Sequence, residues 1–263
     1  MTRLLTAACL VPLLLDGAAG RSIGPAPQGS AAPSMPDALT LARRTDSALR
    51  GRTQHARVSM TVRTPDWQRS LELETWYENP GRTFIRITAP AKEAGTATLR
   101  LGTDMWNYLP QVERVIKVPP SLMLEAWMGS DFSNDDLVKE TSLVDDYTHR
   151  IEGEQVISGD RCYQLIATPK PGAPVVWGRL VVWVRTSDAI PRKEDYYDEH
   201  GSLRKTLAFN DIRQTGDRRY PMRWTMTAVT KPGHESSIVF HSVVFDQPIL
   251  DRTFTQQNLK RVY

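Results

Sequence analysis

The stretch "HARVSMTVRT" (residues 55–64) alternates between apolar and polar side chains. Its apolar positions include Val58, Met60 and Val62, and polar residues stand between them. Successive side chains of a β-strand point to opposite faces of a sheet, so a period of two predicts a strand with one buried and one solvated face. This stretch favours a mainly β (α+β) fold.

The same period continues along the chain. In "RSLELETWYE" (residues 69–78), Leu71 and Leu73 alternate with Glu72 and Glu74. Further strand-like pieces follow between turn sequences such as Asn-Pro-Gly and Gly-Thr-Asp. They include "RTFIRITAP", "TATLRLG", "MWNYLP", "RCYQLIAT", "GRLVVWVRT", "PRKEDYYD", "LRKTLAFNDI", "YPMRWTMTAVT" and "SSIVFHSVVFD". About ten or eleven strands joined by short turns predict one antiparallel sheet that curls into a barrel or most of one.

A helix is expected just before the first strand. Ser34 and Asp37 have the spacing of a capping box, and Gly51 stands where the helix would end. The residues between them carry one apolar stripe, formed by Ala38, Leu41, Ala42, Ala48 and Leu49. This pattern predicts an amphipathic helix that packs on the sheet.

The first 36 residues differ in composition from the rest. Arg3 precedes an apolar run at residues 4–15, and small residues follow it, which is typical of a signal peptide cleaved near Ala19. Residues 20–36 are mostly Gly, Pro, Ser and Ala and read as a flexible linker. We therefore expect a signal peptide at residues 1–19, one folded domain at residues 37–263, and export to the periplasm. Cys162 is then the one cysteine of the mature chain, which excludes an internal disulfide.

Charge and motifs exclude several function classes. The formal net charge is +3, and basic and acidic residues are interspersed, so no nucleic-acid partner is expected. No GxSxG elbow, P-loop or GxGxxG motif occurs. None of the histidines has metal-ligand spacing; they are His55, His149, His200, His234 and His241. We expect no enzyme activity, no catalytic residue, no metal and no cofactor.

Two acidic groups are candidates for chemical sites. "EDYYDEHG" (residues 194–201) could supply oxygen ligands to a metal, but a polar hairpin tip explains it more simply. Asp145 and Asp146 are adjacent, and adjacent side chains of an extended chain point to opposite faces, so they do not easily share a substrate.

The stretch "PPSLMLEAWMGSDFSNDDL" (residues 119–137) is unusually apolar for a polar chain. We interpret residues 121–128 as a short helix that is apolar on nearly every side, which requires apolar partners all round. One side can pack on the sheet, and a lipid is a natural partner for the other, since methionine-rich surfaces adapt to varied ligands. Gly129 would act as a hinge. The predicted lid consists of Leu122, Met123, Leu124, Trp127, Met128 and Phe132.

Below this lid we expect a lipid-binding groove lined by inward-facing strand residues, with the parity chosen from hydrophobicity alone. Burial of a sixteen-carbon acyl chain there would contribute roughly 10 kcal/mol at about 0.8 kcal/mol per methylene. The predicted lining is Val58, Met60, Val62, Leu71, Leu73, Phe84, Leu99, Leu101, Trp106 and Tyr108.

Six blocks occur in order along the chain: "MWNYLPQVERVIKVPP", "GSDFSNDDL", "LVDDYTHRIEGEQVISGDRCYQLIATPK", "YYDEHGSLRKTLAFNDI", "YPMRWTM" and "FTQQNLKR". From about residue 37 to the C-terminus the chain resembles the bacterial outer-membrane lipoprotein-sorting family, which is related to the carriers LolA and LolB. The resemblance implies an incomplete antiparallel β-barrel whose concave face is covered by helices, with acyl chains held between them.

The function implied is a periplasmic carrier that binds acyl chains of a lipoprotein or lipid and shuttles it towards the outer membrane. The resemblance further implies service to an exporter of the resistance-nodulation-division type, with an inner-membrane transporter as donor and an outer-membrane acceptor. We expect a monomer. Three alternatives stay open: a periplasmic sensor or regulatory module on the same scaffold, a β-barrel hydrolase acting near Asp145 or residues 194–200, and a structural subunit of an envelope complex.

Overall fold

The computed structural model describes residues 35–134, 136, 142–173 and 175–261. The predicted signal peptide (residues 1–19) and most of the predicted linker (residues 20–36) lie outside the described residues. No helix in the described part of the chain is both long enough and apolar enough to cross a membrane.

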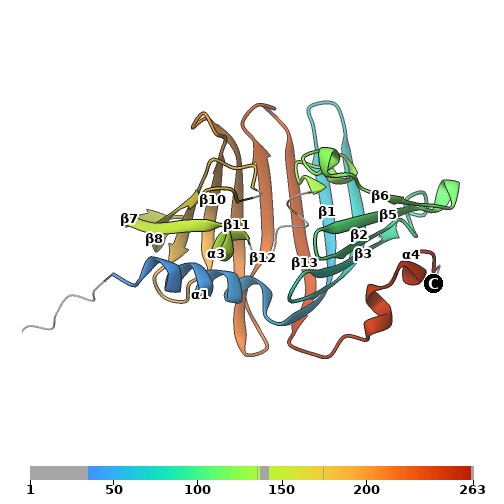
Figure 1. The fold of residues 1–263 in the computed structure, drawn as a ribbon, viewed down its shortest axis with the longest axis horizontal. Coiled ribbons are helices and arrows are strands. Elements are labelled where there is room, and N and C mark those ends of the chain that lie inside the picture. The colour runs from blue at the N-terminus through green and yellow to red at the C-terminus, as the bar shows by residue number, and fades with distance from the viewer. Residues whose placement is uncertain (1–34, 135, 137–141, 174, 262–263) are drawn as a thin grey trace, which may run out of the picture. The chain divides into compact units, whose positions relative to one another are not determined.

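In the described residues, thirteen strands form one antiparallel sheet, in the order β6-β5-β4-β3-β2-β1-β13-β12-β11-β10-β9-β8-β7. Figure 1 shows β1 and β13 side by side in its middle, with β6 and β7 at its two edges. The first six strands are β1 (Thr53–Arg63), β2 (Gln68–Glu78), β3 (Arg82–Ala89), β4 (Ala97–Leu101), β5 (Asp104–Leu109) and β6 (Arg114–Lys117). The others are β7 (Tyr147–Ile157), β8 (Asp160–Pro169), β9 (Arg179–Arg185), β10 (Pro191–Tyr197), β11 (Leu203–Thr215), β12 (Arg218–Ala228) and β13 (Glu235–Phe245).

The predicted fold class, a curled and unclosed antiparallel sheet with few helices, is confirmed. The predicted number of strands, about ten or eleven, is lower than the thirteen of the described sheet. The two strands that the sequence did not reveal, β6 and β7, are the edges of the sheet. Most of their side chains are exposed or half-buried, so they lack a clear apolar period. A register shift between Ile151 and Glu154 further interrupts the alternation in β7.

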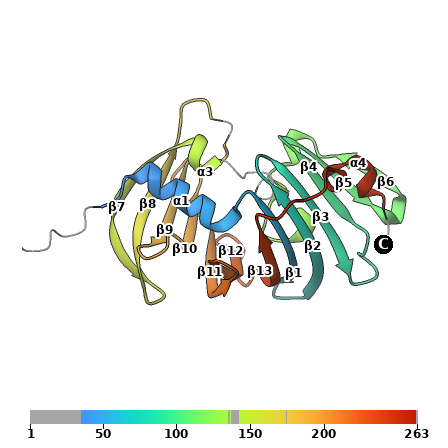
Figure 2. The same ribbon diagram turned by 90° about the horizontal axis from the view of Figure 1, so that it is seen from below.

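The helix α1 (Ala38–Arg50) forms as predicted. The Asp37 side chain caps it by accepting a hydrogen bond from the Thr40 amide at 2.8 Å. Gly51 ends it at a φ of 64°, a left-handed conformation that favours glycine. Leu41 and Ala42 are buried against strands β8 and β9, and Figure 2 shows α1 running across this half of the sheet. We call the face of the sheet that carries α1 the inner face.

The inner face of the other half is covered by the Met/Trp segment, defined as residues 119–134. The predicted helix over residues 121–128 is wrong, because this segment contains only the 3-10 turns η2 (Pro120–Leu122) and η3 (Trp127–Gly129). Trp127 and Phe132 are joined by an amide-to-carbonyl hydrogen bond of 2.7 Å, and Asn134 donates to the Glu125 carbonyl at 3.0 Å. The backbone therefore turns back on itself, and positive φ angles at Met128 (49°) and Gly129 (72°) make this reversal.

The outer face carries the C-terminal segment, defined as residues 247–261. It contains the 3-10 turn η4 (Asp251–Phe254) and the short helix α4 (Gln256–Leu259). Phe254 and Leu259 are buried against Phe84 and Leu99 of the outer face. Two further short elements are η1 (Pro110–Val112), which follows β5, and α3 (Ser142–Asp145), which contacts α1.

Candidate binding pocket

The predicted lid residues divide between the core and the solvent. Trp127 and Phe132 are buried, and Met123 and Met128 pack against the inner-face core. Leu122 and Leu124, by contrast, are 46% and 56% exposed. The apolar side of this segment is thus directed at the sheet, and its remaining leucines face water.

Hydrogen bonds fasten the Met/Trp segment to strands on both sides of it. The Trp127 indole donates to the Thr98 hydroxyl of β4 at 3.3 Å, and Arg69 of β2 donates to the Met128 carbonyl. The hydroxyl of the buried Ser236 on β13 accepts a hydrogen bond from the Asp131 amide at 2.8 Å. It donates a second one to the Asp131 carboxylate at 2.7 Å. These hydrogen bonds hold the Met/Trp segment against the inner face of the sheet. The role of Gly129 as a hinge stays a prediction.

The structure does not bring the ten predicted groove residues together. Five of them lie on the inner face under Trp127: Val58, Met60, Val62, Leu71 and Leu73. The other five lie on the outer face, beneath the C-terminal segment: Phe84, Leu99, Leu101, Trp106 and Tyr108.

The parity of β3 explains this division. Thr75 pairs with Ile85, which places Ile85 and Ile87 on the inner face with Leu73 and leaves Phe84 on the outer face. Because both faces of this strand are covered and apolar, hydrophobicity alone could not show which parity faces inward.

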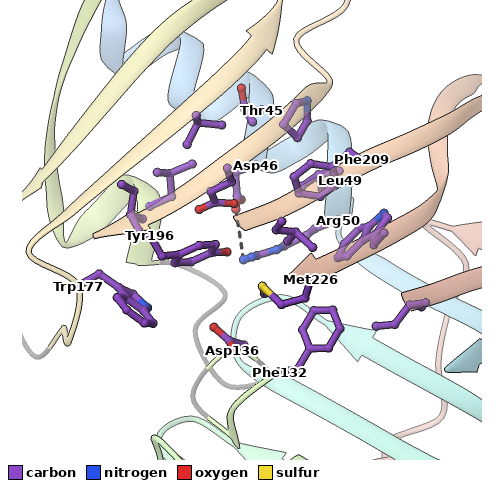
Figure 3. A pocket seen from close by; sticks show the side chains of 18 of the residues that line it. Thr45, Asp46, Leu49, Arg50, Phe132, Asp136, Trp177, Tyr196, Phe209 and Met226 are labelled. Carbon is purple, nitrogen blue, oxygen red and sulfur yellow. Dashed lines mark ion pairs between the residues drawn. The ribbon is translucent and has the colours of Figure 1, made fainter. Parts of the chain in front are cut away.

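An inner-face cavity with a largely apolar lining lies in the other half of the sheet, between α1 and strands β9 to β13 (Figure 3). Its volume is about 170 Å³, and we call it the inner pocket. Its apolar walls are Leu49, Phe132, Leu143, Tyr147, Trp177, Leu180, Val182, Pro191, Leu207, Phe209, Trp224, Met226 and Ile238. Of the predicted lid and groove residues, Phe132 alone lines this pocket.

The sequence carries a signal for this pocket in β11 and β12. Leu207 and Phe209 alternate in β11, and Trp224 and Met226 alternate in β12, with the same period of two as residues 55–64. The Phe209 and Trp224 rings meet edge to face with their centroids 5.1 Å apart. These aromatic walls give the pocket a rigid apolar lining.

One end of the inner pocket is charged. Arg50 and Asp46, one turn apart on α1, form an ion pair of 3.2 Å (Figure 3). The buried Lys205 pairs with Asp136, and its ammonium lies 4.8 Å from the Trp177 ring centroid and 4.9 Å from that of Tyr196. Such cation–π contacts stabilise a desolvated ammonium. The inner pocket thus combines apolar walls with one charged end.

Glu194 is a carboxylic acid whose pKa this environment shifts strongly. It borders the cavity, and burial raises the pKa of its carboxyl from 4.5 to about 7, although a hydrogen bond from Tyr196 opposes the shift. Burial likewise raises the pKa of Asp46, and burial and the Glu194 charge raise that of Tyr196. The pocket therefore holds a carboxyl that is mostly neutral below pH 7.

The interpretation of residues 194–201 as a polar hairpin tip holds for only part of the stretch. The Asp198 carboxylate caps the turn by accepting hydrogen bonds from the backbone amides of His200 and Ser202, at 3.0 and 2.9 Å. Glu194 instead faces the pocket, and Asp195 is buried on the outer face, where the Thr206 hydroxyl donates to it at 2.6 Å. Within the described residues, no three His, Cys, Asp or Glu side chains are arranged as a metal site.

A protein-family model with the description "uncharacterized protein" matches residues 80–261, more than half of the chain. The chain belongs to this family. Among curated proteins, none matches its sequence significantly.

Solved structures of other proteins share the fold of this chain. A DUF1329 family protein from Desulfovibrio piger is 25% identical, with a TM-score of 0.78 over 84% of this chain and 97% of the other. A putative outer membrane lipoprotein-sorting protein domain from Vibrio parahaemolyticus is 22% identical (TM-score 0.73, 85% and 98% covered). A LolA superfamily protein from Nitrosomonas europaea is also 22% identical (TM-score 0.71, 84% and 98% covered). The resemblance to lipoprotein-sorting proteins is thereby confirmed at the level of the fold.

Proposed function

We propose that this chain is a non-enzymatic periplasmic carrier that binds the apolar part of a lipid, or of a lipoprotein's acyl chains, in the inner pocket. The observation that carries the proposal is the apolar, aromatic-walled cavity between α1 and strands β9 to β13. Cavities of this kind are typical binding sites when a few polar groups converge at one end, as Arg50, Asp136 and Glu194 do here.

The pocket size constrains how a lipid would enter. Its volume of about 170 Å³ resembles an engineered apolar cavity of about 150 Å³ that holds benzene. The closed pocket therefore suits the end of an acyl chain, and a complete sixteen-carbon chain requires displacement of α1 or of the Met/Trp segment. Both elements pack on the sheet through side chains and are not paired into its ladder.

The finer parts of the proposal rest on the family resemblance. They are delivery towards the outer membrane, an inner-membrane transporter of the resistance-nodulation-division type as donor, and an outer-membrane acceptor. The names of the similar structures, a lipoprotein-sorting domain and a LolA superfamily protein, support a carrier of this type.

The test is native mass spectrometry of the mature protein purified from its own periplasm, followed by extraction of bound material. A co-purifying diacyl or triacyl lipid is expected, and the variant Leu207→Trp, which fills the pocket, should carry less of it. The matched control, Val156→Trp, adds the same ring at a site that is 68% exposed and should retain the lipid. A protein that stays empty after incubation with envelope lipids would overturn the proposal.

A further inference from the structure

A second cavity lies on the opposite side of the sheet, between strands β2 and β3 and the C-terminal segment. Its volume is about 410 Å³, and we call it the outer cleft. The block "FTQQNLKR", which contributes Asn258 and Arg261 to its lining, has no role in the carrier function proposed above. The side chains that matter for its chemistry are Glu74, Trp76, Arg86, Arg252 and Arg261.

The C-terminal segment is held firmly over this cleft. Arg82 pairs with Asp251 at 2.9 Å, and Arg86 donates to the carbonyl of Asn258. The Asn258 side chain donates to the Thr253 carbonyl at 2.9 Å. With Phe254 and Leu259 buried beneath it, the segment is a built wall of the cleft and carries Arg252 and Arg261 at fixed backbone positions.

The charge of the outer cleft is predominantly positive. Arg86 is 6% exposed and lies at its floor, while Arg252 and Arg261 are exposed at its rim. Glu74 is the one acid among the described residues that line it, and Glu74 contacts the His55 ring nitrogen at 2.7 Å. Guanidinium groups present forked donors that match phosphate oxygens. Three of them against one carboxylate favour an anionic ligand.

A partly apolar hollow of about 280 Å³ adjoins the cleft and shares Trp76 and Thr253 with it. Its polar lining also includes Thr53, His55 and Gln247. Its other walls include Val244, Ile249 and Leu250, and Leu250 is 61% exposed. Trp76 stacks on the His55 ring at 5.0 Å and stands between the two cavities. A cationic cleft beside a partly apolar hollow, with tryptophan between them, suits an amphiphile with an anionic head.

We propose that the outer cleft binds the phosphate group of an anionic lipid at a membrane surface. The arginines hold the phosphate, and the exposed Leu250 enters the boundary between headgroups and acyl chains, while the half-buried Trp76 lines the wall shared by the cleft and the hollow. This site lies on the opposite face of the sheet from the inner pocket, so it docks the protein on a membrane without occupying the cargo site. The proposal does not depend on the carrier function.

The test is co-sedimentation with vesicles of dioleoylphosphatidylcholine, alone or with dioleoylphosphatidylglycerol, at low ionic strength. Binding to the anionic vesicles is expected to fall at least tenfold in the double variant Arg252→Gln, Arg261→Gln, given a contribution of about fivefold per arginine near an anionic surface. The control variant Arg114→Gln, Arg223→Gln removes two exposed arginines elsewhere and should keep at least half of the affinity.

Three results would overturn the proposal. Equal losses in both double variants would show that net charge alone drives binding. Equal binding to both vesicle types would remove the role of the anionic phosphate. Saturable binding of inorganic phosphate by calorimetry, lost in Arg252→Gln, Arg261→Gln but without vesicle binding, would identify a site for a soluble anion instead of a lipid.

Discussion

The ionisation of Glu194 should make stability depend on pH in the acid to neutral range. Its pKa is 4.5 when unfolded and about 7 in the pocket, so between these values the folded chain keeps a proton that the unfolded chain has lost. The free energy of unfolding therefore falls as the pH rises from 4.5 to 7, by up to about 3 kcal/mol for this group.

The variant Glu194→Gln lacks this titration. We expect it to match the wild type near pH 4.5 and to exceed it in stability above pH 7, as measured by urea denaturation at a series of pH values. A stability difference that does not change with pH would contradict the assignment of this pKa.

Trp127 contributes mainly to stability. Because it is buried among Met60, Leu71 and the other residues of the inner-face core, Trp127→Ala should lower the free energy of unfolding by about 3–5 kcal/mol. The substitution Leu124→Ala, at an exposed position of the same segment, should change the free energy of unfolding by less than about 0.5 kcal/mol. Equal effects of the two substitutions in chemical denaturation would show that the segment is not packed as described. Loss of lipid uptake in a Trp127→Asp variant would consequently report on folding as well as on the lid.

At the scale of elements, the Asp136–Lys205 ion pair joins the chain just after the Met/Trp segment to strand β11. Both side chains are largely buried, so Asp136→Ala leaves a buried ammonium without its carboxylate and should cost about 3–5 kcal/mol. The exposed pair Arg213–Asp211 on β11 is the control, and Arg213→Ala should cost less than about 1 kcal/mol. Denaturation midpoints of the two variants measure these costs. Similar losses of stability in both variants would contradict the burial of the Asp136–Lys205 pair.

The elements also show how far the sequence could predict the structure. Eleven strands with apolar alternation and the capped helix α1 were recognisable, because their patterns are local. The Met/Trp segment was not, since its apolar residues suggested a helix while its reversal depends on left-handed residues at Met128 and Gly129. The inner pocket was missed because it forms where α1 meets strands β9 to β13, which lie more than a hundred residues further along the chain.

For the whole molecule, ligand binding should raise thermal stability. A ligand that binds the folded chain alone adds about 2.7 kcal/mol at one hundred times its dissociation constant. With palmitate we expect a Tm increase of several degrees in the wild type and in Val156→Trp, and a smaller one in Leu207→Trp. A full increase in Leu207→Trp, measured by scanning calorimetry, would place the ligand outside the inner pocket.

The position of β1 beside β13 has a consequence for how the chain folds. Every other strand pair in the described sheet joins consecutive strands, whereas Gln54 pairs with Phe245 across most of the sequence. Contacts that close such a long loop form late. During synthesis, the free side of β1 stays an open ladder edge until the last strand emerges, and in a crowded solution the β13 of a second chain could fill that place. The middle of the sheet is therefore the natural site for strand exchange between two copies.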